Sequence, residues 1–178
     1  MIASAQEQRL ARRAARGDRQ ALHFLYEEYS EQLFAVAYRL TESSADAGDL
    51  LHDVFCRLPE AIRSFDRTRP LGPWLRAVTT RTALKHLRSQ RRRREISMVS
   101  TPDELENDGS TELLVLDSIT MERALSSLPE ELRTVVVLKE MEGYSHKEIG
   151  ELLQVSRSTS EGRLYKARKL LRAKKFER

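Results

Sequence analysis

The clustering of arginine and lysine is the feature of this sequence that most clearly indicates what it could bind. Residues 76–94 hold eight basic side chains and no acidic one, and residues 163–178 hold eight basic side chains against one acid. Between these two blocks, residues 95–122 contain eight acidic side chains and neither lysine nor arginine. Two cationic blocks suit the phosphates of a polyanion, although solvated helix faces on either side of an acidic connector would carry the same charges.

The histidine, cysteine and carboxylate side chains form no catalytic or metal-binding pattern. The four histidines, His23, His52, His86 and His146, fall in four different expected helices without ligand spacing. The single cysteine, Cys56, excludes a disulfide framework and a cysteine-based zinc site, and we expect a buried helical thiol in preference to a redox switch. With no phosphate-binding glycine loop and no nucleophile motif, we expect no catalytic residue, no metal, no cofactor and no enzymatic activity.

Length and composition limit the fold class. The chain has 178 residues, of which 40% are hydrophobic and 33% charged, with only 7 glycines and 5 prolines. Long runs of Leu, Ala, Glu, Arg and Lys with so few breakers predict an all-α protein. The net charge of +4 is consistent with a polyanionic partner. No segment approaches the roughly 18 apolar residues of a membrane span, and the N-terminus lacks a signal-peptide core, so we expect a cytoplasmic location.

Capping residues and periodicity predict four helices in the first part of the chain. Ser4 and Glu7 have the spacing of a capping box for a helix that ends at Gly17, and Asp18 is placed to cap a second helix. Apolar residues then recur every three or four positions, and Asp46 is expected to begin the third helix.

A loop and a long basic helix complete this domain. Pro59 falls inside the third helical pattern and should kink that helix or end it early. Residues 65–73 contain two prolines and a glycine and are expected to form a loop, after which a fourth helix runs from about Trp74 into the arginine run. Four helices with short connections predict a compact bundle over residues 1–95.

Residues 96–117 are expected to be a flexible acidic linker, because they are polar and mostly lack periodicity. In the last domain, residues 118–178, a helix is predicted to begin at Ser127 and Glu130, which have capping-box spacing. That helix should end at Gly143. The chain therefore divides into two small helical domains joined by a linker.

Residues 145–164 have the spacing of a helix-turn-helix. Ser145 and Glu148 form a capping box for a short helix, and Ser158 with Glu161 offers a cap for the long basic helix that follows. A tight turn at residues 154–155 separates the two. The second helix of such a motif presents its N-terminal residues to the major groove of DNA. An ordinary helical hairpin is the alternative interpretation.

Three long segments, in this order, resemble one known family. They are DAGDLLHDVFCRL (46–58), SFD with PLGPWLRAVTTRTALKHLRSQRRR (64–66 and 70–93), and LSSLPEELRTVVVLKEMEGYSHKEIGELLQVS with RLYKARKLLR (125–156 and 163–172). Together they resemble a bacterial RNA polymerase sigma factor of the extracytoplasmic-function (ECF) class of the sigma-70 family. The resemblance implies a protein that binds core RNA polymerase and directs promoter-specific transcription initiation. It also implies promoter DNA and an anti-sigma factor as partners, without membrane insertion.

The resemblance implies that the third helix docks on the clamp of the polymerase's largest subunit. Acidic residues beside an apolar stripe suit a partner helix. The expected docking residues are Asp49, Leu50, Leu51, Asp53, Val54 and Arg57. The apolar positions are equally suited to the bundle core, so contact is expected chiefly of Asp49, Asp53 and Leu51. His52 stands where the family usually has Gln, which favours a partner contact over a metal.

The resemblance also implies that the loop and the fourth helix open the minus-10 promoter element. Strand opening needs a cationic track for phosphates and a pocket for unstacked bases. The expected residues are Phe65, Asp66, Trp74, Arg76, Arg81, Lys85 and Arg88, with Trp74 expected in the core rather than as a stacking platform. The run Arg91 to Arg94 is expected to contact phosphates without reading sequence. Arg81 and Lys85 replace the usual Asn and Asp, which leaves the minus-10 preference open.

The helix-turn-helix at residues 145–164 resembles the reader of the minus-35 element. The expected residues are Ser156, Arg157, Ser158, Thr159, Glu161, Arg163 and Lys166. Arg157 can pair bidentately with guanine, and Glu161, in place of a usual Lys, can accept a hydrogen bond from cytosine. Ser160 occupies a position usually filled by a β-branched apolar residue, and Gly162 weakens the helix by about 1 kcal/mol relative to Ala.

Two other functions remain open. A sigma mimic would titrate an anti-sigma factor without supporting initiation, and the unusual residues Ser160, Glu161 and Gly162 motivate this alternative. A stand-alone helix-turn-helix regulator would use the second domain alone, which the docking helix and the basic fourth helix argue against.

Overall fold

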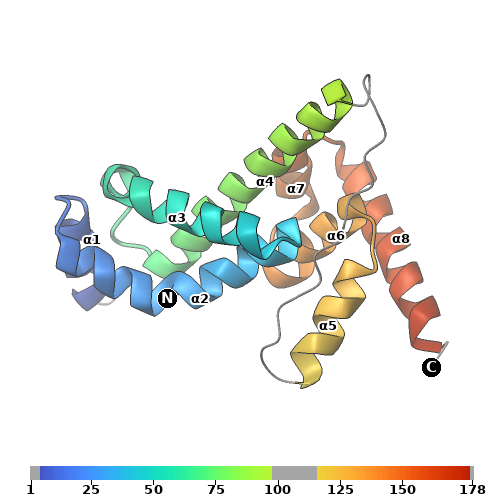
Figure 1. The fold of residues 1–178 in the computed structure, drawn as a ribbon, viewed down its shortest axis with the longest axis horizontal. Coiled ribbons are helices and arrows are strands. Elements are labelled where there is room, and N and C mark those ends of the chain that lie inside the picture. Colours follow the sequence, from blue (N-terminus) through green and yellow to red (C-terminus); the bar gives the residue numbers. More distant parts are fainter. Residues whose placement is uncertain (1–4, 98–115, 177–178) are drawn as a thin grey trace. The chain divides into compact units, whose positions relative to one another are not determined.

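The computed structural model describes residues 5–97 and 116–176, and every regular element within these residues is a helix (Figure 1). The chain separates into two units, residues 1–100 and 101–178. The predicted all-α class with two helical domains is therefore confirmed. The Ser4 part of the first capping box and most of the predicted linker lie outside the described residues. The helices on either side reach slightly into the predicted linker, because one ends at Ser97 and the next begins at Leu116.

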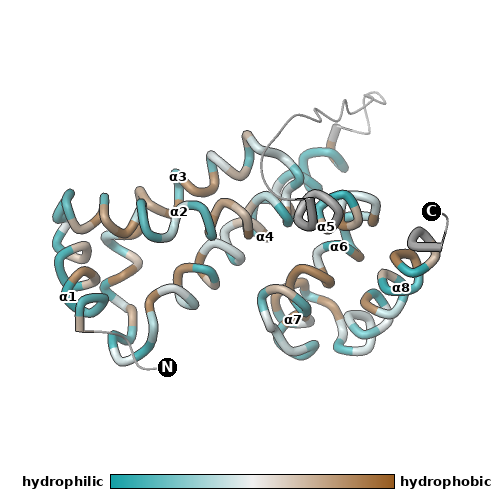
Figure 2. The backbone as a smooth tube through the Cα atoms, turned by 90° about the horizontal axis from the view of Figure 1, so that it is seen from below, coloured by the Kyte–Doolittle hydropathy of each residue, from teal (hydrophilic) through white to brown (hydrophobic). Residues whose placement is uncertain are grey.

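Over residues 5–97, the first unit is a bundle of four α-helices. These are α1 (Ala5–Ala14), α2 (Arg19–Thr41), α3 (Ser44–Ala61) and α4 (Leu71–Ser97), with a short 3₁₀ helix η1 (Ile62–Ser64) after α3. Helix α2 packs against α1, α3 and α4, and α3 also packs against α4. Buried apolar residues from all four helices fill the centre, among them Ala14, Leu25, Leu58 and Leu75. Figure 2 shows hydrophobic and hydrophilic stretches alternating along the helices, as expected where each helix buries one face.

Local side chains set the helix boundaries in this unit. Asp18 caps α2 as predicted, since its carboxylate accepts from the backbone N–H groups of Gln20 and Ala21. Helix α3 begins earlier than predicted. Ser43 accepts from the backbone N–H of Asp46 at 3.1 Å, so Ser43 is the cap and Asp46 lies in the first turn.

Two prolines lie inside helices near an end of each. Pro59 occupies the last turn of α3, which ends at Ala61 and continues as η1, so the predicted early end falls two residues after the proline. Helix α4 starts at Leu71, three residues before the predicted Trp74. Pro73 is tolerated in this first turn because the N–H that it lacks would have no partner within the helix.

The described part of the second unit contains four α-helices, and the last two form the helix-turn-helix. They are α5 (Leu116–Ser126), α6 (Glu130–Val136), α7 (His146–Leu153) and α8 (Arg157–Phe176), and α6 continues as a π-helical turn η2 (Val137–Met141). Both α6 and α7 pack against α8. The side chains of Leu138, Ile149 and Ala167 are fully buried.

Of the three Ser–x–x–Glu boxes predicted here, one is confirmed. Ser145 and Glu148 cap α7 reciprocally, and Gln154 ends that helix in the left-handed conformation, as the predicted turn requires. The box at Ser127 is wrong, because its hydroxyl donates to the Ala124 carbonyl at the end of α5, and α6 has no side-chain cap. The cap predicted at Ser158 is also wrong, because the Ser156 hydroxyl accepts from the Thr159 N–H at 3.0 Å.

Within the part of the chain that the structure describes, no helix combines the length and the apolar character that a membrane crossing requires.

Candidate nucleic-acid and partner interfaces

The charged residues predicted for docking lie together on the solvent face of α3. Asp49, Asp53 and Arg57 are exposed at intervals of one helical turn, and the Arg57 Nη2 donates to the Asp53 carboxylate at 3.2 Å. The three apolar members of the set, Leu50, Leu51 and Val54, are only 4%, 7% and 4% exposed. Leu51 belongs to the bundle core, so its side chain offers little surface to a partner in this structure.

Cys56 lies on the same exposed side of α3. Its thiol is free and exposed, 3.3 Å from the Nε2 atom of His52 one turn earlier. The expectation of a buried thiol is therefore wrong, because Cys56 falls on the face of α3 opposite to the buried Leu51 and Leu58. Among the described residues, no group of three or more His, Cys, Asp or Glu side chains could hold a metal ion.

The loop before α4 is anchored by aromatic packing. Phe65 is 7% exposed, and its ring centroid lies 5.0 Å from that of Trp74, which packs against the core as expected. The buried ring of Phe65 is not open to an unstacked base in this structure. Asp66 is exposed, and its carboxylate accepts from both the N–H and the hydroxyl of Thr68. These bonds, together with nearby Arg69, lower the pKa of Asp66 and fix the loop.

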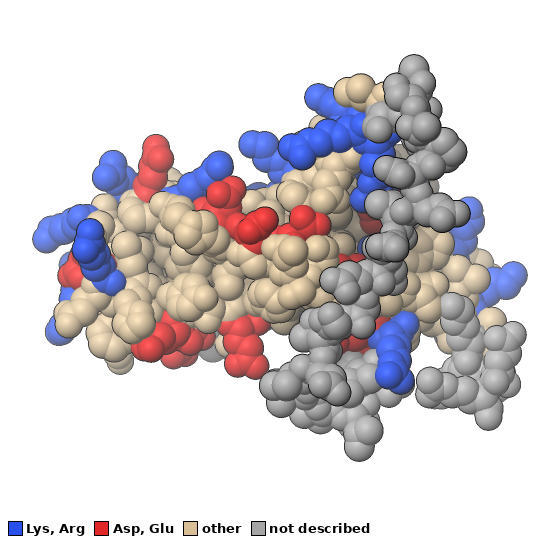
Figure 3. Space-filling view, in the orientation of Figure 1, with Lys and Arg blue, Asp and Glu red and all other residues tan. Residues whose placement is uncertain are grey.

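Basic side chains follow one face of α4. Arg81, Lys85 and Arg88 are exposed at positions i, i+4 and i+7, whereas Arg76 is half-buried. Figure 3 shows Lys and Arg side chains gathered over the second half of α4, with Asp and Glu side chains over α3. Arg81, Lys85 and Arg88 therefore share one exposed side of α4, and Arg76 contributes less surface to it.

A polar contact that the sequence did not predict joins α3 to α4. The Asp46 carboxylate lies 3.2 Å from the Nε2 atom of His86 and accepts from the Gln90 side-chain amide at 3.1 Å. Asp46 is in the first turn of α3, and both of its partners lie on α4. The hydrogen bond from Gln90 therefore helps to hold the α4 segment that carries the basic residues against α3. The sequence gives little indication of this contact, because His86 and Gln90 lie 40 and 44 residues after Asp46.

Short hydroxyl side chains surround the start of α8. The Ser156 hydroxyl lies 2.9 Å from the Ser158 hydroxyl and 2.7 Å from the Thr159 hydroxyl, and all three residues are exposed. Arg157 is exposed beside them, and its Nε donates to the Glu161 carboxylate at 2.8 Å. The structure thus brings five of the seven predicted minus-35 residues together in little more than one turn of helix.

The other two predicted minus-35 residues differ in their surroundings. Lys166 is exposed. Arg163 is 22% exposed, and its Nη2 donates to Glu131 at 2.7 Å, which ties α8 to α6. A second bond of the same kind joins Arg168 to Glu140 at 2.6 Å. The Arg163 guanidinium is therefore already paired with a carboxylate of its own domain.

Two further residues of α8 stand out in the structure. Ser160 is completely buried and shares a hydrogen bond with the Nδ1 atom of His146 at 2.9 Å, so the unusual hydroxyl at this core position has a polar partner. Tyr165, which sequence analysis did not single out, is 72% exposed one turn after Glu161. The sequence did contain a signal for Tyr165, because an aromatic residue stands there among basic residues of a helix.

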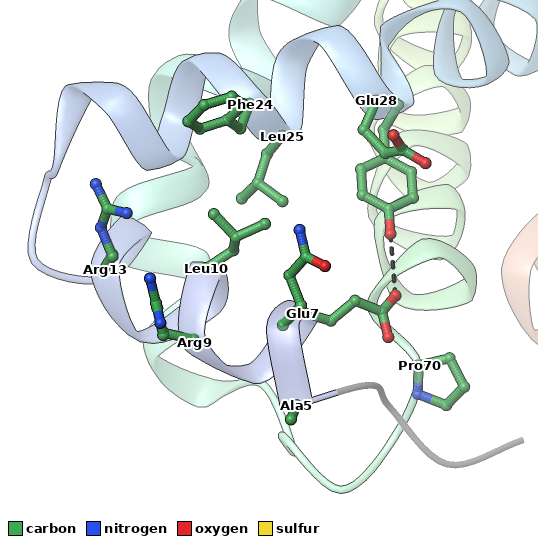
Figure 4. A pocket seen from close by; sticks show the side chains of 11 residues that line it. Ala5, Glu7, Arg9, Leu10, Arg13, Phe24, Leu25, Glu28 and Pro70 are labelled. Atoms are coloured by element: carbon green, nitrogen blue, oxygen red, sulfur yellow. Dashed lines mark hydrogen bonds between the residues drawn. The ribbon is translucent and has the colours of Figure 1, made fainter.

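A hollow of about 1020 Å³ lies between α1, α2 and the loop at Pro70 (Figure 4). Leu10, Phe24 and Leu25 are among its apolar lining residues. The Tyr29 hydroxyl donates to the Glu7 carboxylate at 3.0 Å, which holds α1 on α2. Burial, followed by this hydrogen bond, raises the pKa of Tyr29 to about 12.

Two family models match the chain, and each falls within one unit. The model described as Sigma-70 region 2 matches residues 25–93, and the model described as Sigma-70, region 4 matches residues 118–171. The first match runs from within α2 to near the end of α4, and the second contains the helix-turn-helix.

Relatives and solved structures agree with these matches. The RNA polymerase sigma-H factor of Pseudomonas aeruginosa is 27% identical over 96% of this chain and 94% of its own length. The ECF RNA polymerase sigma-E factor of Escherichia coli K12 is 27% identical over 93% and 92% of the two chains. A structure of CnrH in complex with the cytosolic domain of CnrY has 26% identity and a TM-score of 0.53, covering 93% and 94% of the chains.

A second solved structure, the sigma factor RpoE in complex with the anti-sigma factor NepR from Bartonella quintana, shares the fold. It has 23% identity and a TM-score of 0.56, covering 80% of this chain and 89% of its own. Both sigma regions occur here in one chain and in order, each on its own helical unit. The chain therefore belongs to the extracytoplasmic-function class of the bacterial sigma-70 family.

Proposed function

We propose that this chain binds core RNA polymerase through α3 and directs the enzyme to promoters that it reads with α4 and with the helix-turn-helix. The observation that carries this proposal is the presence of both sigma regions on helical units whose predicted contact faces are largely exposed. Sigma factors are initiation factors rather than catalysts, so the chemistry of RNA synthesis belongs to the polymerase.

For core binding we propose the charged face of α3. The Asp49 side chain is exposed and has no hydrogen bond or ion pair with another described residue, whereas the Asp53 carboxylate is paired with Arg57. An exposed carboxylate without a partner can accept a salt bridge from a basic helix without first breaking an internal one. Asp49 is therefore the residue from which we expect the strongest contribution to docking.

For the minus-10 element we propose that Arg81, Lys85 and Arg88 follow the phosphates. Their spacing covers about two turns of one α4 face, which suits the backbone of a separated strand. Asp66 would shape the preceding loop rather than contact phosphate, because its carboxylate is already hydrogen-bonded to Thr68. Phe65 would support that loop from the core.

For the minus-35 element we propose the exposed first turn of α8. The hydroxyls of Ser156, Ser158 and Thr159 can donate to phosphate or base edges, and Lys166 can follow the backbone further along the helix. Arg163 would act indirectly by holding α8 on α6. We also propose that the chain has an anti-sigma partner, which the solved RpoE–NepR complex supports for a protein of the same fold.

The test is run-off transcription with purified core polymerase on a library of genomic fragments. We expect specific transcripts with the wild-type chain and their loss in the double variant Asp49→Arg/Asp53→Arg. The matched control is Glu28→Arg/Glu31→Arg, which makes the same charge change on α2, where Glu28 lines the hollow toward α1. We expect the control to transcribe normally and both variants to keep their helical content.

Two results would contradict the proposal. Core binding without any transcripts would favour a sigma mimic that titrates an anti-sigma factor. Tight and specific promoter binding by the chain alone, without core polymerase, would favour a stand-alone helix-turn-helix regulator.

A further inference from the structure

Arg157 and Glu161 form an ion pair at the exposed start of α8. Arg157 is the first residue of this helix, and Glu161 follows one turn later. The Arg157 Nε donates to the Glu161 Oε1 at 2.8 Å, and the two side chains are 74% and 45% exposed. In a helix-turn-helix, the N-terminal residues of the second helix meet base edges in the major groove. The pair therefore occupies the position from which such motifs read sequence.

The atoms that make this contact determine what remains free. A guanidinium has one N–H on Nε and two on each Nη. Glu161 occupies the Nε side, and Arg157 has no other partner among the described residues. The edge formed by Nη1 and Nη2 is therefore available. Guanine presents O6 and N7 in the major groove, and two parallel N–H groups of arginine fit this pair of acceptors.

The pairing also fixes the charge of Glu161. The hydrogen bond from Arg157 is the main cause that lowers the pKa of Glu161, and the charges of Arg157 and His146 act in the same direction. The carboxylate is therefore ionised at neutral pH. A lone carboxylate at this position would repel DNA phosphates, whereas the pair carries no net charge.

We propose that Glu161 is a positioning residue that holds Arg157 with its Nη1/Nη2 edge toward a guanine of the minus-35 element. The pair, and not either residue alone, then selects that base. The inference rests on the proposed function, because it requires that α8 reads promoter DNA. The competing role for Glu161 is direct acceptance of a hydrogen bond from a cytosine amino group.

The test uses holoenzyme assembled from core polymerase and the full chain. Promoters are selected from a library with a randomised upstream element and a fixed minus-10 element. We expect the wild type to prefer guanine at one upstream base pair by roughly 10-fold to 100-fold. Arg157→Lys should lose this preference, because lysine keeps the charge but not the two-pronged edge. Glu161→Ala should lose most of it at the same base pair.

Three further variants sharpen the test. Glu161→Gln should keep part of the preference, because its amide oxygen still accepts from Nε. The double variant Arg157→Lys/Glu161→Ala should be no worse than Arg157→Lys alone, since the two residues act as one unit. Glu151→Ala is the matched control, because Glu151 is an exposed acid of α7 without a partner among the described residues. Its base preferences should equal those of the wild type.

Two results would overturn the inference. In the first, Glu161→Ala removes a preference for cytosine at a different base pair and leaves the guanine preference intact, which makes Glu161 a direct reader. In the second, Glu161→Ala strengthens transcription equally on all sequences, which leaves only phosphate repulsion. Failure of the proposed function is distinguishable from both, because the wild-type holoenzyme itself would then produce no specific transcripts.

Discussion

The hydroxyl of Ser160 is the polar group most deeply enclosed in the helix-turn-helix. It is completely buried, and its partner is the Nδ1 atom of His146 on the facing helix α7. A buried polar group left without a hydrogen bond costs more than the bond itself contributes. The Ser160–His146 hydrogen bond therefore adds little to the free energy of unfolding, but removing one partner should lower that free energy by more than the bond contributes.

We expect Ser160→Ala to lower the free energy of unfolding of the second unit by about 1 kcal/mol, because His146 loses its partner. His146→Ala should cost a similar amount, and the double variant should cost less than the sum of the two. Urea denaturation of the four proteins in this mutant cycle measures the coupling. Strictly additive losses would mean that the two side chains do not interact.

The Tyr29–Glu7 hydrogen bond makes the attachment of α1 depend on pH. The folded protein raises the pKa of Tyr29 from 10.0 to about 12, with burial as the main cause and Glu7 as the second. The unfolded chain loses this proton near pH 10, so the stabilisation is complete below pH 10 and disappears as the pH rises toward 12.

We therefore expect Tyr29→Phe to remove this part of the alkaline loss of stability. The quantity to measure is the difference in free energy of unfolding between wild type and variant, which should shrink between pH 10 and pH 12. The phenol absorbance of the wild type should also contain a component near pH 12 that is absent from Tyr29→Phe. A constant stability difference across this range would contradict the assignment.

From the sequence, it was hardest to predict which side chains of the proposed interfaces face the solvent and which face the core. Helical spacing correctly placed Asp49 and Asp53 on one face, because residues one turn apart share a side of the helix. It did not separate Leu51 from its exposed neighbours, nor did it expose Cys56, because the width of the buried stripe depends on how α2 and α4 pack against α3. Pairs such as Arg163 with Glu131 join residues distant in sequence and follow only from the fold.

At the scale of elements, capping patterns and periodicity predicted the four α-helices of the first unit and three of the four described in the second, but they missed α5 and placed several helix starts wrongly. The Ser–x–x–Glu pattern held at Ser145, where the serine directly precedes an amphipathic segment. It failed at Ser127 and Ser158, because in each case a different hydrogen bond forms in place of the predicted cap. Ser127 completes the end of α5, and Ser156 caps α8 two residues earlier. A pattern of local hydrogen-bonding residues cannot rank such competing caps without the positions of the flanking helices.

Two glycines of the helix-turn-helix have opposite roles. Gly162 lies inside α8, is exposed, and has open space where a Cβ would be. Gly150 lies in α7, and a Cβ there would meet the Val155 carbonyl oxygen at 2.8 Å. That oxygen belongs to the turn between the two helices, so Gly150 permits the close approach of the turn, whereas Gly162 only weakens the helix.

We expect Gly162→Ala to raise the free energy of unfolding of the second unit by about 1 kcal/mol through helix propensity alone. Gly150→Ala should lower the melting temperature, because the turn backbone must shift to relieve the contact. Thermal unfolding followed by circular dichroism measures both changes. Equal effects of the two substitutions would show that the close approach of the turn does not constrain α7.

At the scale of the whole molecule, the chain consists of two units with separate cores. The pattern of charges along the sequence already predicted two basic bodies, and each unit now has its own set of buried residues and its own sigma region. Leu58 is 1% exposed in the first unit, and Leu138 is completely buried in the second. Two cores formed by separate stretches of chain can be destabilised one at a time.

We expect Leu58→Ala to destabilise the first unit by about 2–5 kcal/mol and to leave the second unit unchanged. Leu138→Ala is the reciprocal variant and should affect only the second unit. Hydrogen exchange of the intact chain, read by mass spectrometry, separates the two cases, because faster exchange should appear only in peptides of the unit that carries the substitution. If either variant speeds exchange in both units alike, the chain unfolds as one cooperative body, and the two surfaces proposed to read promoter DNA would gain or lose their order together.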